Sequence, residues 1–286
     1  MWTEIAEKIA RATGQDFTLA DRQSVSGGCI NQGYLVKGKQ AQYFVKLNDA
    51  NLVEMFAAEA LGLKQMFATQ TIIVPKPVCW GTADSNSYIV LQWLELGRSD
   101  RAWTQMGHQL AAMHRQGTSA EFGWEMNNTI GSTPQVNTWM DNWADFFAEQ
   151  RIGYQLRLAK CRGGSFSNLD RVVEAVREKL KARQPQASLL HGDLWSGNAA
   201  FTSDGQPVIF DPATYYGDRE ADLAMTELFG GFPTAFYNGY NEAWQLDRGY
   251  SERKNIYNLY HILNHFNLFG GGYGNQAKRI IDRLTG

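Results

Sequence analysis

The sequence contains little cysteine, no long apolar run and no excess of charge of one sign. Its three cysteines, Cys29, Cys79 and Cys161, are too few and too widely spaced for a disulfide scaffold. No apolar stretch approaches the ~20 residues that span a bilayer. Residues 1–14 have the spacing of a short amphipathic helix rather than that of a signal peptide. We therefore expect a cytoplasmic protein that does not enter a membrane.

Charge and composition narrow the class of protein further. The 27 basic and 29 acidic residues give a net charge of −2, so no global charge favours nucleic acid or an anionic membrane as a partner. Hydrophobic residues make up 44% of the chain and aromatic residues 13%, which excludes a disordered chain or a coiled coil. A chain of 286 residues is long enough for two lobes and a large core.

The period of the apolar pattern changes along the chain, from strands to helices. After a helix at 1–14, strands are predicted within 19–28, 31–38, 40–47, 78–81 and 88–93, with one helix over 52–67. Helices are then predicted over 101–116, 138–159, 167–183, 220–229, 234–245, 251–269 and 275–284. We therefore predict an α+β, two-lobed protein, with a small β-rich N-lobe over 1–94 and a larger, mainly helical C-lobe over 95–286.

The strongest chemical signal lies in residues 188–212, which interrupt the helical pattern with a loop and a hairpin. Asp193 follows His191 and Gly192, Asn198 comes five residues later, and Asp211 ends the next strand pair. Each residue alone is an ordinary turn residue, but their joint spacing suits phosphoryl transfer. The first acid can accept a hydroxyl proton, and the other two side chains offer oxygen ligands to Mg²⁺ that bridges nucleotide phosphates.

A second signal lies in the predicted N-lobe. Lys46 stands on a strand, and Glu59 stands on the helix that follows it. Kinase-like folds use such a pair to direct an ammonium group at the nucleotide phosphates. The turn before this strand contains Gly27, Gly28 and Cys29, where the backbone can approach a phosphate, although a plain hairpin explains the glycines as well.

Several longer segments resemble the fructosamine-3-kinase (ketosamine-3-kinase) family. They are HGDLWSGN, IFDPA, YYGDREADLAM and NLFGGGY, together with FGWEMNNTIGSTPQVNTWMDNWADFFAEQRI in the middle of the chain. The resemblance implies a protein-kinase-like, aminoglycoside-phosphotransferase-like fold that uses ATP and Mg²⁺. Its expected acceptor is the 3-hydroxyl of a ketoamine, which is a fructosamine, ribulosamine or erythrulosamine adduct of a small amine or a protein lysine. Phosphorylation then leads to deglycation.

The resemblance also implies roles for single residues in the phosphoryl transfer. Asp193 becomes the general base, and Asn198 and Asp211 become the Mg²⁺ ligands. Lys46 becomes the lysine that contacts the phosphates, held by Glu59.

The same resemblance assigns residues to the adenine and to the sugar. Gln92, Trp93 and Leu94 match the hinge of the family, so the backbones of Gln92 and Leu94 should contact adenine. Trp195 resembles the aromatic residue that packs against the sugar.

Cys29 has two interpretations. Neighbouring backbone amides would favour its thiolate, so oxidation could link two chains into a dimer. Alternatively, Cys29 is an inert small residue in a tight turn, and the protein is a monomer.

Other residues that suggest chemistry are expected to be structural. His261 and His265 are four residues apart on an apolar helix, and packed, hydrogen-bonded histidines are favoured over a metal pair. The aromatic residues of 139–147 have helical spacing and are expected in the core. Asp222, near the start of a helix, is expected to be buried and to support the catalytic loop.

Two other functions remain open on the sequence. A kinase of another small hydroxyl compound, similar to aminoglycoside or choline kinases, would need an acid-lined acceptor site or an aromatic cage. A nucleotide-binding protein without enzymatic activity is the less favoured alternative, because the base, the metal ligands and the lysine are all present.

Overall fold

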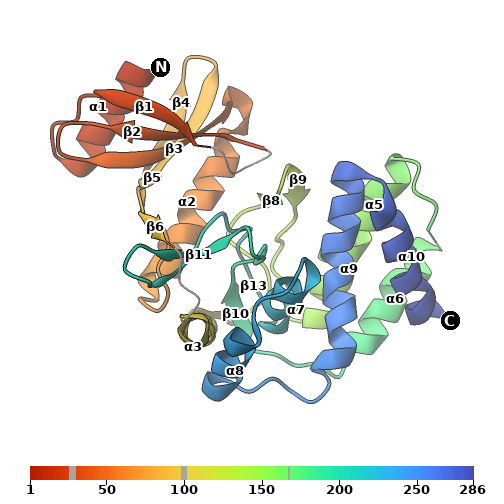
Figure 1. Ribbon diagram of the computed structural model, residues 1–286. Helices are drawn as coiled ribbons and strands as arrows, with labels where there is room; N and C mark the ends of the chain where they lie inside the picture. The colour runs from red at the N-terminus through yellow and green to blue at the C-terminus, as the bar shows by residue number, and fades with distance from the viewer. Residues whose placement is uncertain (26–29, 98–101, 167) are drawn as a thin grey trace. The chain divides into compact units, whose positions relative to one another are not determined.

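The computed structural model describes residues 1–25, 30–97, 102–166 and 168–286 (Figure 1). The chain divides into two compact units. The first unit contains Met1–Ala102 and Ala200–Asp211, and the second contains Trp103–Ala199 and Pro212–Gly286. A short hairpin therefore belongs to the first unit, although about a hundred residues of the second unit precede it in the chain.

The first unit is built on a five-stranded antiparallel sheet in the order β1-β2-β3-β5-β4. The strands are β1 (Asp21–Val25), β2 (Gln32–Lys37), β3 (Gln42–Asp49), β4 (Pro77–Ala83) and β5 (Asn86–Gln92). The helices are α1 (Trp2–Thr13), the single turn Ala50–Leu52 and α2 (Val53–Ala68). All the strands and both helices that the apolar pattern predicts in this part of the chain are thus present.

Alternation of apolar residues explains the core of this unit. Val45 on β3 is fully buried and clusters with Val36 on β2 and Val90 on β5. Helix α1 adds Ile5 and Ile9, which are four residues apart and therefore lie on one face of the helix. Burying each of these side chains contributes about 1.5–3 kcal/mol.

A three-stranded sheet, in the order β12-β11-β6, completes the first unit. Its strands are β6 (Leu96–Gly97), β11 (Ala199–Thr202) and β12 (Pro207–Ile209). The predicted hairpin turns at Asp204 and Gly205, where the Thr202 N–H donates to the Gln206 carbonyl over 2.9 Å. Strand β12 pairs with Ile73, which brings Asp211 into this unit.

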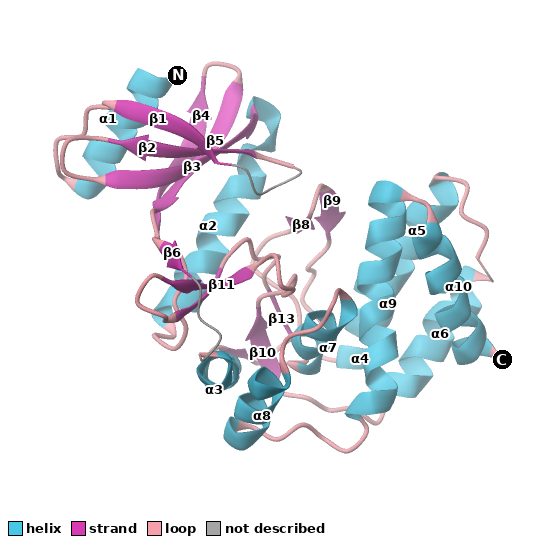
Figure 2. Cartoon of the chain, viewed as in Figure 1, coloured by secondary structure: helices cyan, strands magenta, loops and turns pink. Residues whose placement is uncertain are grey.

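The second unit is mostly helical (Figure 2). Its helices are α3 (Trp103–Gln116), α4 (Trp143–Phe146), the π-helix Phe147–Gly153, α5 (Tyr154–Cys161), α6 (Leu169–Leu180), α7 (Glu220–Leu228), α8 (Thr234–Ala243), α9 (Tyr250–Phe269) and α10 (Gly272–Thr285). Its strands are β7 (Thr118–Ser119), β8 (Asn128–Ile130), β9 (Thr133–Gln135), β10 (Ala187–Leu190) and β13 (Tyr215–Gly217). Within the described parts of the chain, no helix is both long and apolar enough to span a bilayer.

The helix predicted over 138–159 differs from the observed structure. It begins only at Trp143, because the Asn142 side chain accepts the Asp145 N–H at 3.1 Å and caps the helix start. Trp139 precedes the cap. It stacks on Tyr216 with 36% of its surface exposed, so its predicted place in the core is wrong. The other predicted aromatic residues of this segment, Trp143, Phe146 and Phe147, are buried.

Candidate active site

The first unit brings together Lys46, Glu59 and Asp211, three of the residues predicted for the site. Lys46 lies on β3 opposite Gly33 and Ile89, and only 4% of its surface is exposed. Its ammonium nitrogen is 2.7 Å from Oε1 of Glu59 on α2 and 2.5 Å from Oδ1 of Asp211, which follows β12. A strand, a helix and a distant hairpin thus converge on one ammonium group.

Electrostatics keep this ammonium group charged. Burial alone would lower the pKa of Lys46, but the carboxylates of Asp211 and Glu59 together raise it above its ordinary value. Burial raises the pKa of Glu59, and the charge of Lys46 opposes that shift. The result is a buried cation between two acidic groups.

Asp211 has an unusual backbone and an accessible carboxylate. Its φ angle is 58°, in the left-handed region that aspartate tolerates better than most residues. Its side chain is 41% exposed. One carboxylate oxygen is bound to Lys46, and the exposure leaves the group accessible to a ligand.

The predicted hinge follows β5. The Gln92 N–H donates to the Lys76 carbonyl over 2.8 Å, so this N–H is already bonded within the first unit. The ring of Trp93 lies 6.4 Å from that of Phe44, and Leu94 is half-buried. The predictions for Gly27, Gly28 and Cys29 fall outside the described residues.

In the second unit, the loop after β10 carries His191, Gly192 and Asp193. Gly192 has a φ angle of 81°, and a Cβ atom at this position would overlap the carbonyl oxygen of Ala213. The Ala213 N–H in turn donates to the His191 carbonyl over 2.8 Å. Only glycine fits this position of the loop.

Asp222 on α7 binds the backbone of the same loop through its side chain. Its buried carboxylate accepts the N–H groups of His191 at 2.7 Å and Gly192 at 2.8 Å. It lies 3.1 Å from Nε2 of His114. Burial would raise the pKa of Asp222, but the bonds to His114 and Gly192 lower it overall. The prediction that Asp222 is buried and supports this loop is confirmed.

Asn198 closes the loop onto Asp193. Its amide nitrogen donates to the Asp193 carbonyl at 2.8 Å and lies 3.3 Å from Oδ2 of the same residue. Its backbone N–H donates to the Trp195 carbonyl over 2.9 Å. Because the amide nitrogen points into the loop, the Asn198 side-chain oxygen points away, and it accepts no hydrogen bond from the described residues. Trp195 itself is 38% exposed.

Sequence reasoning missed His114, which the structure buries completely. Its Nδ1 is 2.8 Å from the hydroxyl of Tyr240 on α8, so the imidazole joins α8 to Asp222. The sequence contains a signal for this burial, because Met106, Leu110 and His114 recur every four residues and share the buried face of α3.

The two predicted packed histidines of α9 differ from each other. Nδ1 of His265 is 2.8 Å from the His261 carbonyl, as a packed, hydrogen-bonded histidine should be. Nδ1 of His261 is buried and has no hydrogen-bond partner among the residues that the structure describes, so the prediction that both are hydrogen-bonded is wrong for His261. No group of three or more His, Cys, Asp or Glu side chains in the described chain is arranged to hold a metal ion.

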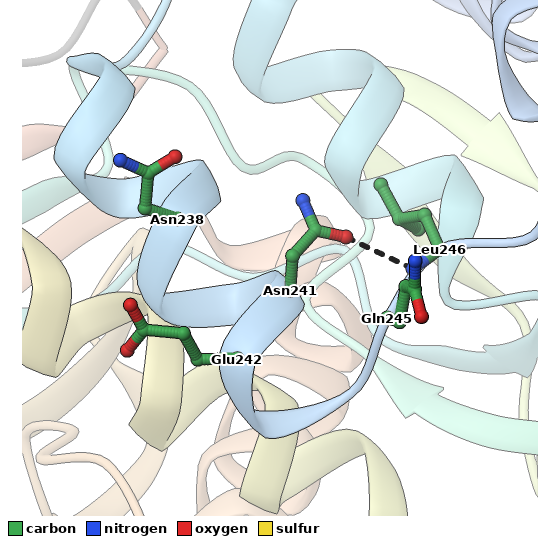
Figure 3. Close-up of a pocket in the computed structure, with 5 residues that line it drawn as sticks. All are labelled: Asn238, Asn241, Glu242, Gln245 and Leu246. Carbon is green, nitrogen blue, oxygen red and sulfur yellow. Dashed lines mark hydrogen bonds between the residues drawn. The ribbon is translucent and has the colours of Figure 1, made fainter.

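A depression at the end of α8 contains none of the predicted site residues. Asn238, Asn241, Glu242, Gln245 and Leu246 line it (Figure 3). The Asn241 side chain accepts the Leu246 N–H there, which closes the turn after the helix.

Comparisons with known proteins agree along the whole chain. The model of the fructosamine kinase family matches residues 1–286. A probable ketoamine kinase from Synechocystis sp. is 59% identical over 98% of this chain and 95% of its own length. A chloroplastic protein-ribulosamine 3-kinase from Arabidopsis thaliana is 43% identical over 91% of this chain and 81% of its own length.

Solved structures agree in fold. A candidate fructosamine-3-kinase from Haemophilus somnus 129PT has a TM-score of 0.94 at 32% identity, over 100% of this chain and 98% of its own. A choline kinase from Streptococcus pneumoniae has a TM-score of 0.63 at 17% identity, over 99% of this chain and 98% of its own. This likeness shows the fold alone. The fold is therefore the predicted protein-kinase-like one, and the chain belongs to the fructosamine kinase family.

Proposed function

We propose that this protein is an ATP-dependent kinase that phosphorylates the 3-hydroxyl of ketoamines. The observation that carries the proposal is the Lys46 ammonium held by both Glu59 and Asp211. A buried cation fixed in this way suits the binding of nucleotide phosphates. The acceptor class rests on relatives that are named ketoamine kinases or ribulosamine 3-kinases.

Asp193 is the proposed general base. A carboxylate within reach of the acceptor hydroxyl can take its proton as the oxygen attacks the transferred phosphoryl group. Asp222 and Asn198 support this role, because their hydrogen bonds fix the loop on either side of Asp193. The exposed ring of Trp195 is the proposed surface for the sugar.

The residues present fit a magnesium nucleotide. The proposed ligands are the side-chain oxygen of Asn198, which accepts no hydrogen bond from the described part of the chain, and the exposed carboxylate of Asp211. Mg²⁺ prefers such oxygen ligands. Bound Mg²⁺ would neutralise phosphate charge during the transfer. A structural neighbour, an aminoglycoside phosphotransferase 14% identical to this chain, was solved as a ternary complex with AMP-PNP and hygromycin B. Such a neighbour supports the fold alone, so ATP is part of the proposal.

The test is ³¹P NMR of the protein with Mg-ATP and lysine adducts of fructose, ribulose and erythrulose. We expect a new phosphomonoester signal with at least one adduct. Asp193→Asn should lower kcat roughly 10²–10⁴-fold, the contribution of a general base, and leave ATP affinity nearly unchanged. The matched control is Asp204→Asn in the hairpin turn, which should keep full activity.

Two results would contradict the proposal in different ways. Full turnover by Asp193→Asn would exclude Asp193 as the base. No phosphomonoester with any adduct, while ATP still binds, would exclude these ketoamines as acceptors and favour another small hydroxyl compound.

A further inference from the structure

Arg151 is a charged residue buried in the second unit without a carboxylate partner. None of its surface is exposed, and no acidic group of the described chain lies within ion-pair distance of it. Its Nη1 donates to the Val136 carbonyl over 2.6 Å, and its Nη2 donates to Oδ1 of Asn137 over 2.7 Å. Its Nε has no hydrogen-bond partner within the described ranges. Burying a cation is unfavourable, so a function is needed to explain it.

Aromatic rings take the place of a counter-ion. The guanidinium carbon lies 4.0 Å from the ring centre of Tyr215, 4.6 Å from that of Phe146 and 5.6 Å from that of Tyr260. The electron-rich faces of these rings attract a desolvated cation. Arg151 also lies in a π-helical turn, Phe147–Gly153, a rare geometry that is frequent at functional sites.

A continuous series of hydrogen bonds leads away from this guanidinium. The Asn137 amide nitrogen donates to Oδ1 of Asn128 over 2.9 Å. Gln135 donates to the same oxygen at 2.8 Å and to the Ala213 carbonyl at 3.0 Å. The hydroxyl of Tyr260 donates to Oε1 of Gln135 over 2.6 Å. The side chains of Asn128, Gln135 and Asn137 thus join Arg151 to Ala213, and we call these three residues the amide brace.

The brace ends at the backbone that touches the catalytic loop. The carbonyl of Ala213 packs against the α-carbon of Gly192 so closely that a side chain there would overlap it. The Ala213 N–H donates to the His191 carbonyl. A displacement of Ala213 therefore moves the backbone on either side of Gly192, next to Asp193.

We infer that Arg151 is a positioning residue for phosphoryl transfer, acting through the amide brace on the loop that carries Asp193. The inference rests on the proposed function, because it assigns Asp193 the role of base. A misplacement of about 1 Å at a reacting group can lower the rate roughly 10²-fold. A buried arginine bound by its fork to two acceptors supplies rigidity that a flexible lysine does not.

The test compares Arg151→Lys and Arg151→Met with the control Arg177→Lys. Arg177 lies on α6 and pairs with Asp145 and Glu149 at the edge of the same helical segment. Assays run well below the unfolding temperature of each variant, so that loss of folded protein does not lower the measured rate. Arg151→Lys should lower kcat roughly tenfold to a hundredfold with KM for ATP unchanged, and the control should match the wild type.

A double-mutant cycle tests whether the brace carries the effect. Gln135→Leu removes the donor to Ala213 and should lower kcat to a similar extent. If both residues act through one path, the double variant loses little more than either single variant. Losses that multiply, or a KM for ATP that rises while kcat stays constant, would overturn the inference.

Hydrogen exchange provides a readout that does not depend on the acceptor. The Ala213 amide, bonded to His191, should exchange several-fold faster in Arg151→Lys than in the wild type or in Arg177→Lys. Unchanged exchange would overturn the inference. If no ketoamine is phosphorylated by the wild type, the proposed function fails, and the exchange rates alone decide on the brace.

Discussion

At the scale of the single residue, two constraints explain why a glycine, Gly192, directly precedes the proposed base Asp193. The φ angle of 81° is strained for any residue with a side chain, and the Ala213 carbonyl occupies the space of a Cβ atom. Gly163 has nearly the same φ angle, 80°, but open space around it. Comparing the two glycines therefore separates the energetic cost of backbone strain from that of steric overlap with Ala213.

Gly192→Ala should destabilise the protein by roughly 2–5 kcal/mol, the sum of left-handed strain and overpacking. Gly163→Ala should cost only about 1–2 kcal/mol, because strain acts alone. Urea unfolding of the two variants measures the difference. Equal free energies of unfolding would show that the loop relaxes around the new methyl group and would contradict the geometry described for Ala213.

Some residues of the site could be predicted from the sequence, and others could not. Lys46 and Glu59 were predictable as a pair, because chain order alone puts a lysine strand before a glutamate helix, and the structure confirms their contact. Asp193 and Asn198 were predictable as one loop from their spacing. Arg151 was not, because its role depends on a π-helical turn and on acceptors from a separate hairpin, neither of which leaves a local pattern.

At the scale of the element, two glycines let helices α3 and α8 approach each other closely. A Cβ atom at Gly107 on α3 would overlap the Phe236 carbonyl oxygen, and one at Gly239 on α8 would overlap that of Thr104. Because the obstacles are backbone atoms, they cannot rotate away. The same contact carries the bond between His114 and Tyr240, so the crossing bears on the support of the loop that carries Asp193.

In an open helix, replacing glycine with alanine stabilises by about 1 kcal/mol. Here we expect the reverse: Gly107→Ala and Gly239→Ala should each destabilise by about 1–3 kcal/mol through overpacking. Gly272→Ala, in the first turn of α10 with nothing near its Cβ position, is the control and should be neutral or stabilising. Thermal unfolding of the three variants gives the order of their stabilities. A higher unfolding temperature for Gly107→Ala would argue against the close crossing.

Some element boundaries could be predicted from local sequence signals, whereas others depend on tertiary pairing. Short, turn-bounded runs rich in β-branched and aromatic residues predicted the five strands of the first unit's larger sheet. The start of α4 at Trp143 depends on the Asn142 cap, and a helix drawn through Trp139 overlooked this local signal. The membership of β11 and β12 in the first unit depends on pairing with β6 and Ile73, which no local pattern contains.

At the scale of the whole molecule, the fold and the acceptor rest on different evidence. A choline kinase and an aminoglycoside phosphotransferase share the fold at 17% and 14% identity, although their acceptors differ. The fold therefore does not select a ketoamine. The ketoamine acceptor rests instead on the full-length match to the family and on the 59% identity with a probable ketoamine kinase.

The acid stability of the molecule depends on local groups, because a net charge of −2 produces little overall repulsion near neutral pH. Burial lowers the pKa of His261 to about 3, with His265 and Arg151 acting in the same direction and Asp222 opposing them. An unfolded histidine binds its proton near pH 6.5. Between these pH values only the unfolded chain is protonated at this site. The contribution of His261 to the free energy of unfolding is therefore fully present above about pH 6.5 and falls with decreasing pH.

The wild type should therefore lose about 1.6 kcal/mol more than His261→Gln between pH 6.5 and pH 5, because the slope rises toward about 1.4 kcal/mol per pH unit as the unfolded histidine becomes protonated. The raised pKa of Glu59 and of Glu220 shifts stability in the opposite direction, but equally in both proteins, so the difference isolates His261. The exposed His108, replaced by Gln, controls for the loss of a histidine. Urea midpoints across this range provide the measurement. If wild type and His261→Gln lost stability in parallel, His261 would have to be protonated as readily in the folded protein as in the unfolded chain. Its buried Nδ1, which has no hydrogen-bond partner among the described residues, opposes this.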